Sequence, residues 1–321
     1  MSAPLIFAIP SKGRLKEQVE GWLADAGFRL EMAGGERGYR ATLLGLPGAE
    51  VRLLSAADIA AAIDAGEVHL GVTGEDLLRE RGEGLDARVM LLRALGFGRA
   101  DLVVAVPKSW IDVETMADLD EVAHLRTVRT GQRMRVATKY LAQTRAFFAA
   151  HGIADYRIVE SGGATEGAPA SGAAELIVDI TTTGATLAAN NLKILADGVI
   201  LKSQAQLAAS LTVTWSADQL ATVRRLLGVV EARARAKGIA TLVWPAEQDK
   251  AADAVASRFV KRGASRRANG MLVAEGDLFD ATQALAQAGV GPVTAATPDY
   301  VFEPDCPAAE ALAARARQRA R

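Results

Sequence analysis

The chain has 321 residues, of which 50% are hydrophobic and 23% are charged, enough apolar material for two or three cores and too much for a disordered chain. Its 37 basic and 38 acidic residues give a net charge of −1, which excludes a bulk field that would draw it to nucleic acid. The single cysteine, Cys306, excludes an internal disulfide and a thiolate metal cage. Because neither an export signal nor a long apolar stretch is evident, we expect a soluble, cytoplasmic protein without membrane contact.

Short apolar runs alternate with helical patterns along most of the chain, which indicates a mainly parallel α/β architecture. In chain order we expect a strand at 5–9, helices at 15–26 and 57–65, strands at 68–72 and 102–106, a helix at 140–150, strands at 156–160 and 176–180, short strands near 194 and 200, and a long helix at 216–238. Pro107 ends the strand at 102–106, where we expect the chain to cross between two domains. Ser216 and Gln219 form a capping box that begins the long helix.

A change of pattern at Ile239 predicts a small third domain. From there the chain alternates strand, helix, strand, helix and strand, and only one strand, from Met271 to Glu275, is evident between the two helices. The chain ends in the basic, alanine-rich segment EALAARARQRAR. We expect a solvated helix there and assign it no function.

The most informative stretch is LIVDITTTGATL, residues 176–187. A hydrophobic strand delivers Asp179 to its carboxyl end, and three threonines and Gly184 then turn the chain into a helix. Backbone N–H groups, hydroxyls and a helix N-terminus suit an anion, and a neighbouring carboxylate suits sugar hydroxyls. These residues fit a ribose 5-phosphate site, and they fit equally well a threonine-rich turn capped by glycine.

Two further turns from strand to helix carry polar residues. In Ser11-Lys12-Gly13-Arg14 two cations oppose the dipole of the helix that they begin. This conflict at the carboxyl end of a strand favours a phosphate-bearing ligand, although solvated surface charges explain it as well. In the segment GVTGED, residues 71–76, the acids suit the first turn of a helix, so that capping explains most of the pattern.

Several kinds of site have no counterpart in the sequence. The histidines are His69, His124 and His151, and none lies at the spacing of a catalytic triad or a metal site. Neither a dinucleotide-binding glycine motif nor a P-loop is present. A reaction at this protein should therefore need little acid–base chemistry from side chains.

The segment ESGGATEGAPASGAAELIVDITTTGATLAANNL closely resembles the signature region of the ATP phosphoribosyltransferase family, which carries out the first step of histidine biosynthesis. The segments AIPSKGRL, DIAAAIDAGEVHLGVTGEDLL, LGFGRADLVVAV, RVATKYL and FDATQALAQAGV resemble the same family in the same order. The likeness spans most of residues 5–300, and the length is similar to that of the family's long form.

The resemblance implies a two-lobed core like that of a periplasmic binding protein and a ferredoxin-like regulatory domain. Lobe I would comprise 1–106 and 203–225, lobe II 107–202, and the third domain 226–321. Asp179 would bind the ribose hydroxyls of phosphoribosyl pyrophosphate, near Glu166. The remaining residues on this side would be Thr181, Thr182, Thr183, Gly184, Ala185 and Thr186. By a looser transfer, the nucleotide side would comprise Lys12, Gly13, Arg14, Gly74 and Glu75.

The implied reaction is attack by N1 of the adenine of ATP on C1 of the ribose, with pyrophosphate leaving together with Mg²⁺. Positioning and charge neutralisation would then supply the catalysis. We assign no residue to proton transfer or to a metal ion. The resemblance also implies a homo-oligomer (a dimer or a hexamer), allosteric control and histidine as a feedback inhibitor.

Two departures from the family pattern qualify these expectations. Residues 120–134 are longer than the family's usual turn, and the third domain looks abbreviated because the family has a strand pair between its two helices. We therefore expect weak histidine inhibition and assign no inhibitor residues. The alternatives are phosphoribosyl transfer to another base and a non-catalytic regulatory or metabolite-binding paralogue with the same two-lobed fold. The lack of an export signal disfavours a solute receptor, and the lack of an N-terminal helix-turn-helix disfavours a transcription regulator.

Overall fold

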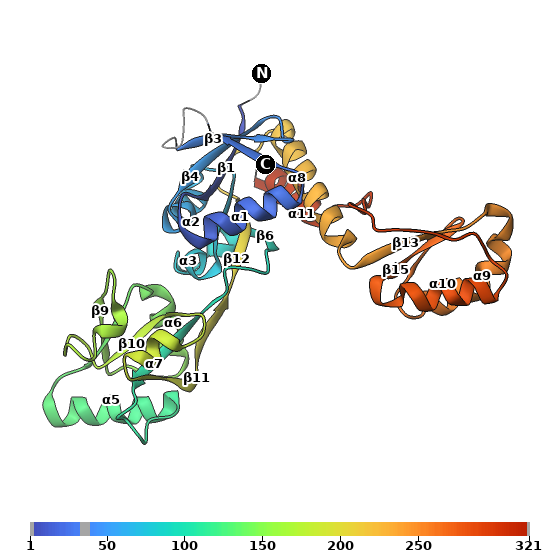
Figure 1. The fold of residues 1–321 in the computed structure, drawn as a ribbon. Coiled ribbons are helices and arrows are strands. Elements are labelled where there is room, and N and C mark those ends of the chain that lie inside the picture. Colours follow the sequence, from blue (N-terminus) through green and yellow to red (C-terminus); the bar gives the residue numbers. More distant parts are fainter. Residues whose placement is uncertain (1–2, 33–38, 320–321) are drawn as a thin grey trace.

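The computed structural model describes residues 3–32 and 39–319, which form two α/β lobes and a separate third domain (Figure 1). Each lobe is built on its own sheet, and a third sheet forms the remaining domain. The predicted two-lobed α/β core is thereby confirmed. In Figure 1 the third domain stands apart from the lobes and joins lobe I through α8.

Lobe I is built on a seven-stranded sheet with the order β2-β3-β4-β1-β5-β12-β6, in which β1 pairs in parallel with β4 and β5. Its elements are β1 (Leu5–Pro10), α1 (Gly13–Asp25), β2 (Arg29–Met32), β3 (Arg40–Leu44), β4 (Ala49–Leu54), α2 (Ala56–Ala65), β5 (Leu70–Gly74), α3 (Glu75–Arg79), α4 (Leu85–Arg88), β6 (Val89–Ala94), β12 (Ala205–Ser210), α8 (Ala217–Ala236) and α11 (Pro307–Arg319). Apolar residues of α1, α8 and α11 share one core, and those of α2, α3 and α4 share another. Helices thus cover both faces of the sheet. The sheet is mixed rather than mainly parallel as expected, because its other four neighbouring pairs are antiparallel.

Lobe II is built on a five-stranded sheet with the order β11-β7-β10-β8-β9. Its elements are β7 (Ala100–Pro107), α5 (Met116–Thr130), β8 (Met134–Thr138), α6 (Leu141–Ala150), β9 (Tyr156–Glu160), the 3₁₀ turn η1 (Thr165–Gly167), β10 (Leu176–Thr181), α7 (Ala185–Ala189) and β11 (Leu192–Ser203). Strand β8 runs parallel to both β9 and β10, so the carboxyl ends of these three strands meet at one edge. The residues that extend the segment 120–134 form most of α5, which begins with a capping box at Thr115 and Asp118.

Strands β7 and β11 carry the chain into lobe II and back, and they pair with each other antiparallel. The strand predicted at 102–106 lies within β7, whose residues pair with β10 in the sheet of lobe II, and the crossing expected there stays a prediction. The prediction of two short strands near Ile194 and Ile200 is wrong, because β11 is a single strand of 12 residues. Shifts in its register on either side of Val199 interrupt the hydrophobic alternation, which made one strand resemble two.

The third domain is a complete ferredoxin-like unit, so the prediction that it is abbreviated is wrong. Its four-stranded sheet has the order β14-β15-β13-β16 with every neighbour antiparallel. Its elements are β13 (Ile239–Val243), η2 (Ala246–Gln248), α9 (Asp249–Val260), β14 (Ser265–Arg267), β15 (Gly270–Ala274), η3 (Glu275–Asp277), α10 (Leu278–Gln287) and β16 (Thr294–Ala296). The strand missed from sequence is β14, because an edge strand of one serine and two arginines shows no apolar pattern.

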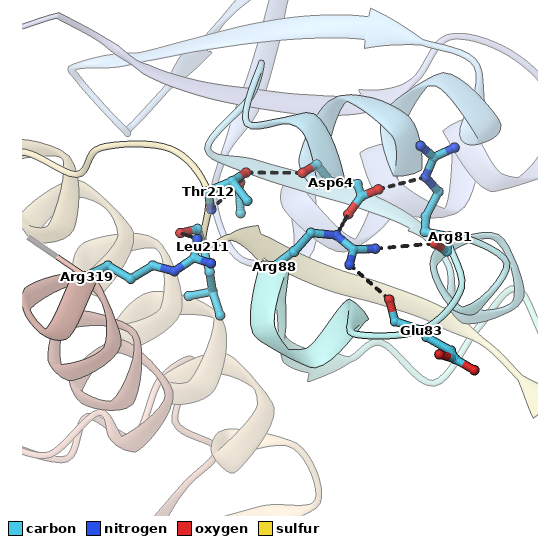
Figure 2. A network of polar contacts seen from close by, with 8 residues as sticks. Asp64, Arg81, Glu83, Arg88, Leu211, Thr212 and Arg319 are labelled. Carbon is cyan, nitrogen blue, oxygen red and sulfur yellow. Dashed lines mark hydrogen bonds and ion pairs between the residues drawn. The ribbon is translucent and has the colours of Figure 1, made fainter.

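The basic tail forms α11, which packs on lobe I, so the prediction of a solvated helix is wrong. Leu312 is fully buried, and Ala309 and Cys306 are nearly so, within the core shared by α1 and α8. The guanidinium of Arg319 donates to the carbonyl of Leu211, which follows β12 (Figure 2). The last two residues of the tail lie outside the described residues.

An arginine–carboxylate cluster holds the neighbouring corner of lobe I (Figure 2). Asp64 accepts hydrogen bonds from Arg88 at 2.6 Å and Arg81 at 3.0 Å, while its carbonyl accepts one from the hydroxyl of Thr212. Burial by itself would raise the pKa of Asp64, but the two guanidinium groups outweigh it and the pKa is lowered. The cluster therefore ties the end of α2 to the start of β6 and to the chain that leaves β12.

Candidate active site

A polar pocket of about 240 Å³ lies at the carboxyl end of β10. Strand β10 brings Asp179 to the pocket and the loop that follows brings the threonines. The 3₁₀ turn η1 supplies Glu166 from a different part of lobe II. The lining residues are Ala100, Glu166, Asp179, Ile180, Thr181, Thr182, Thr183, Ala185, Thr186 and Leu187. Of the residues that the sequence analysis groups around phosphoribosyl pyrophosphate, all line this pocket except Gly184, which lies within the same loop.

Asp179 is a partly buried carboxyl group whose pKa is raised. Burial raises its pKa, and the negative charge of Glu166 raises it further. The N–H of Ile180, which donates to Asp179 Oδ1 at 2.8 Å, and the positive charge of Lys139 act in the opposite direction without cancelling the effect. The pocket thus contains two carboxylates near one lysine. Their oxygens can accept hydrogen bonds from donor groups of a ligand.

Hydrogen bonds within the threonine loop, residues 181–186, fix its conformation. Thr181 Oγ1 accepts from the N–H of Gly184 at 2.9 Å, and Gly184 adopts a φ of +75° that favours glycine. Within residues 3–32 and 39–319, the N–H groups of Thr183 and Thr186 have no protein acceptor. Because α7 has only five residues, hydroxyls and backbone N–H groups, rather than a helix dipole, are the features that could hold an anion here.

A second groove, of about 670 Å³, adjoins this pocket on the side of lobe I. Arg14, Leu15 and Gln18 of α1 form one wall, the loop 96–99 forms the other, and Thr182 of lobe II closes the end. Thr182 lines both cavities and its hydroxyl donates to the carbonyl of Arg99 at 3.3 Å. The two cavities therefore meet at Thr182, on the boundary between the lobes.

The other residues predicted on the nucleotide side lie around this groove without lining it. Lys12 and Gly13 are exposed at the start of α1, beside Arg14. Gly74 ends β5 and Glu75 begins α3. The carboxylate of Glu75 accepts from Gln206 Nε2 at 2.8 Å and from Arg79 at 3.4 Å, so protein groups already engage it.

Sequence analysis did not single out Arg99, which lines the groove, or Lys139, whose charge acts on Asp179. Lys139 directly follows β8, and β8 pairs in parallel with β10. The signal was available, because a polar residue at the carboxyl end of a strand beside β10 reaches the same edge as Asp179. Arg99 precedes the crossing strand β7 and carries no comparable signal.

Comparisons with known proteins agree with this geometry. A family model described as HisG: ATP phosphoribosyltransferase matches residues 55–231. An ATP phosphoribosyltransferase of Caulobacter vibrioides is 73% identical over 303 residues, which cover 94% of this chain and 95% of that protein. One of Bradyrhizobium diazoefficiens is 51% identical over 314 residues, covering 96% and 97%. The chain belongs to the ATP phosphoribosyltransferase family.

The family assignment confirms the enzyme predicted from sequence, a glycosyltransferase of the first step of histidine biosynthesis. A solved ATP phosphoribosyl transferase (HisG:HisZ) complex from Thermotoga maritima is 25% identical with a TM-score of 0.54, and it covers 71% of this chain and 96% of the solved chain. Nearly the whole of that chain therefore matches only part of this one.

Two further findings concern metals and membranes. Within residues 3–32 and 39–319, no group of three or more histidine, cysteine, aspartate or glutamate side chains could hold a metal ion. In the same part of the chain, no helix is long and apolar enough to cross a bilayer.

Proposed function

We propose that the pocket at β10 binds phosphoribosyl pyrophosphate and that the adjoining groove binds ATP. The observation that carries the proposal is that the two cavities meet at Thr182. A transfer between two substrates requires their reacting atoms to lie within about 3–3.5 Å. Adjoining cavities in different lobes supply such a geometry, whereas a single enclosed pocket would serve a binding protein equally well.

In this proposal Asp179 accepts hydrogen bonds from the ribose hydroxyls, with Glu166 nearby. The 5-phosphate lies on the loop that follows, where hydroxyl and N–H donors are concentrated: Thr181, Thr182, Thr183, Gly184, Ala185 and Thr186. Donors of this kind bind phosphate without needing a cationic side chain. The raised pKa of Asp179 supports its role, because burial without a full set of partners is a feature of functional sites.

For ATP we propose the groove beside α1. Arg14 lines the groove and Lys12 and Gly13 are exposed next to it. Two cations at the start of a helix cost stability unless an anion is bound near them, and the triphosphate of ATP would meet them. Gly74 and Glu75 belong to this side more loosely, since Glu75 is engaged by Gln206 and Arg79.

The proposed reaction forms a bond between N1 of adenine and C1 of the ribose, while the bond from C1 to pyrophosphate breaks and its electron pair leaves with pyrophosphate. The protein's part is to orient the two substrates across the lobe boundary and to keep the ribose in place through Asp179. No side chain is needed to remove a proton before the bond forms, because N1 of adenine attacks with its own lone pair.

Enzymes of this family depend on a metal ion, and we propose Mg²⁺. The pocket contains two carboxylates, Asp179 and Glu166, which are oxygen ligands of the type that Mg²⁺ accepts but are too few to enclose it. An ion that enters with the pyrophosphate and keeps several waters therefore fits these residues. When bound, it would neutralise charge on the leaving group.

We further propose the domain boundaries 1–106 with 203–225, 107–202 and 226–321. Strand β7 nevertheless pairs within the sheet of lobe II, position 226 lies within α8, and α11 packs on lobe I. A homo-oligomer, a dimer or hexamer, in the cytoplasm and inhibition by histidine remain part of the proposal. The complete third domain removes the reason to expect weak inhibition.

Calorimetry with phosphoribosyl pyrophosphate, followed by turnover with ATP and Mg²⁺, tests the assignment. We expect saturable binding and turnover, detected by the ultraviolet absorbance of N1-substituted adenine with pyrophosphatase present. Binding without turnover on ATP would favour another acceptor base, and the absence of both would favour the non-catalytic paralogue.

A further inference from the structure

Asp76 is a buried acid that the proposed reaction does not use. It is the second residue of α3 in lobe I and is only 7% exposed. Its Oδ1 accepts from the hydroxyl of Ser203 at 2.7 Å, and its Oδ2 accepts from the hydroxyl of Tyr140 at 2.7 Å. Its own N–H donates to Ser203 Oγ at 3.0 Å. A buried carboxylate is costly unless donors satisfy it, and these donors come from outside its own helix.

The donors to Asp76 come from lobe II and from the strand that links the lobes. Tyr140 precedes α6 in lobe II and is 1% exposed, and Ser203 is the last residue of β11. A second acid, Glu80, directly follows α3. Its carboxylate accepts hydrogen bonds from the N–H groups of Ala142 and Gln143 at 2.8 and 3.2 Å. A carboxylate of lobe I thus caps a helix of lobe II, where the positive end of the helix dipole favours it.

The same residues adjoin both proposed binding sites. Gly74 and Glu75 directly precede Asp76, and Lys139 directly precedes Tyr140. The ammonium of Lys139 lies 5.1 Å from the centre of the Tyr140 ring, and its positive charge lowers the pKa of Asp179, opposing burial. Burial and the charge of Asp76 together raise the pKa of Tyr140, so it stays a hydrogen-bond donor at neutral pH.

We propose that Asp76, Tyr140 and Ser203 are positioning residues that fix lobe I against lobe II in the arrangement required for phosphoribosyl transfer. The inference rests on the proposed function. Two strands, β7 and β11, connect the lobes, and a pair of strands can bend or twist where their ladder ends. The contacts to Asp76 lie at that end, since Ser203 pairs with Ala100 at the start of β7.

The physical basis is that hydrogen bonds to a buried charge are both strong and directional. Each lobe holds one substrate in the proposal, so the angle between the lobes sets the distance from N1 of ATP to C1 of the ribose. A displacement of about 1 Å can cost roughly a hundredfold in rate. Because the residues that line the pocket around Asp179 all belong to lobe II, loosening the contact should leave the binding of phosphoribosyl pyrophosphate largely intact.

The test compares Tyr140→Phe, Asp76→Asn and the double variant with the wild-type protein. Tyr156→Phe serves as the matched control, because it removes a hydroxyl of lobe II that makes no protein hydrogen bond among the described residues, while its ring still packs on Phe148. For each folded protein we measure kcat, KM for ATP and the Kd for phosphoribosyl pyrophosphate by calorimetry.

We expect kcat to fall by about tenfold to a hundredfold in each single variant, as the loss of one hydrogen bond to a charged group predicts. The Kd should stay within about threefold of the wild-type value. The double variant should lose about as much as Asp76→Asn alone, because the hydrogen bond from Tyr140 is already impaired in that variant. The control should be indistinguishable from wild type.

Unchanged kcat in folded Tyr140→Phe would overturn the proposal, as would a double variant whose loss equals the product of the two single losses. A rise in Kd that accounts for the whole loss would place Tyr140 in the binding pocket and refute the positioning role. Where Asp76→Asn or Tyr140→Phe does not fold, Ser203→Ala removes one donor to Asp76 and the same criteria apply. If the wild-type protein neither binds nor turns over the substrates, the proposed function fails instead.

Discussion

Replacing Asp179 by alanine tests the proposed ribose site most directly. Asp179 would accept hydrogen bonds from two ribose hydroxyls, and a hydrogen bond to a charged group contributes about 1.5–3 kcal/mol. Loss of both would weaken transition-state binding by about 3–6 kcal/mol, or roughly 10²–10⁴ in kcat/KM. The assay is the absorbance of N1-substituted adenine with pyrophosphatase present. An activity within about threefold of wild type would refute the assignment of Asp179.

The same substitution should leave the fold at least as stable as before. Burial raises the pKa of Asp179 in the folded protein, so the folded state favours the protonated form more than the unfolded state does. The contribution of Asp179 to stability is therefore favourable at acid pH and is lost as the pH rises through its folded pKa. We expect the Tm of Asp179→Ala at neutral pH to equal or exceed that of wild type, and a marked drop would attribute any loss of activity to unfolding.

Asp112→Ala is a suitable control for this experiment. Asp112 is an exposed acid of the same lobe. It follows the carboxyl end of β7, which pairs with β11 near Leu192. The pocket lies at the opposite end of β7, where Asp101 pairs with Thr181. Removing its carboxylate should change neither kcat/KM nor Tm. A comparable loss of activity in this variant would mean that net charge, rather than contact with the ribose, explains the result.

Three further outcomes follow from the contacts described. Thr182→Val should lower kcat/KM by about tenfold, since the hydroxyl at the junction of the two cavities is lost; an unchanged value would contradict a role for this junction. In a pH titration, kcat/KM should fall as acid protonates Asp179, at a higher pH than an ordinary aspartate because its pKa is raised; a profile that stays flat down to the usual aspartate range would argue against an ionised Asp179. Leu312→Ala should cost about 2–5 kcal/mol in urea unfolding because Leu312 is fully buried; a cost near zero would show that α11 is not part of the core of lobe I.

Local patterns in the sequence predicted most of the elements that build the two lobes. The capping box at Ser216 and Gln219 begins α8 as expected, and the apolar face of that helix is buried. Strand β10 and the polar residues at its end were evident because a buried strand is a continuous apolar run and its carboxyl end is the usual place for a ligand. Such signals lie within a few neighbouring residues.

The features that sequence analysis missed depend on contacts between distant segments. Asp76 accepts hydrogen bonds from Ser203 and Tyr140, which lie 127 and 64 positions away in the chain. No local sequence pattern predicts such a contact. Strand β14 has three residues, and it is recognised as a strand by its antiparallel pairing with β15 rather than by its own composition. The burial of α11 was likewise not predicted. Alanine occurs on both solvated and packed helices, and the apolar stem of arginine can cover a core while its charged end stays in water, so the helix shows no distinct apolar face.

The third domain is fastened to lobe I at both of its ends, which limits how it can move. It begins where α8 ends, and the chain that leaves it returns along α8, with the N–H of Val301 donating to the carbonyl of Ala232 at 2.9 Å. At the same junction Asp25, the last residue of α1, binds Lys237 at 2.7 Å and Arg233 at 3.0 Å. The hydrogen bond from Lys237 is the main reason that the pKa of Asp25 is lowered.

Helix α1 therefore has its last residue in this clamp and its first turn, with Arg14, at the groove that adjoins Thr182. Because an α-helix of this length is nearly rigid, a displacement at the clamp that tilts α1 also moves Arg14. A change in the position of the third domain must then be absorbed either by breaking the contacts of Asp25 or by shifting the wall of the groove. The fold thus gives the third domain a mechanical connection to the groove wall at Arg14 in lobe I that does not pass through lobe II.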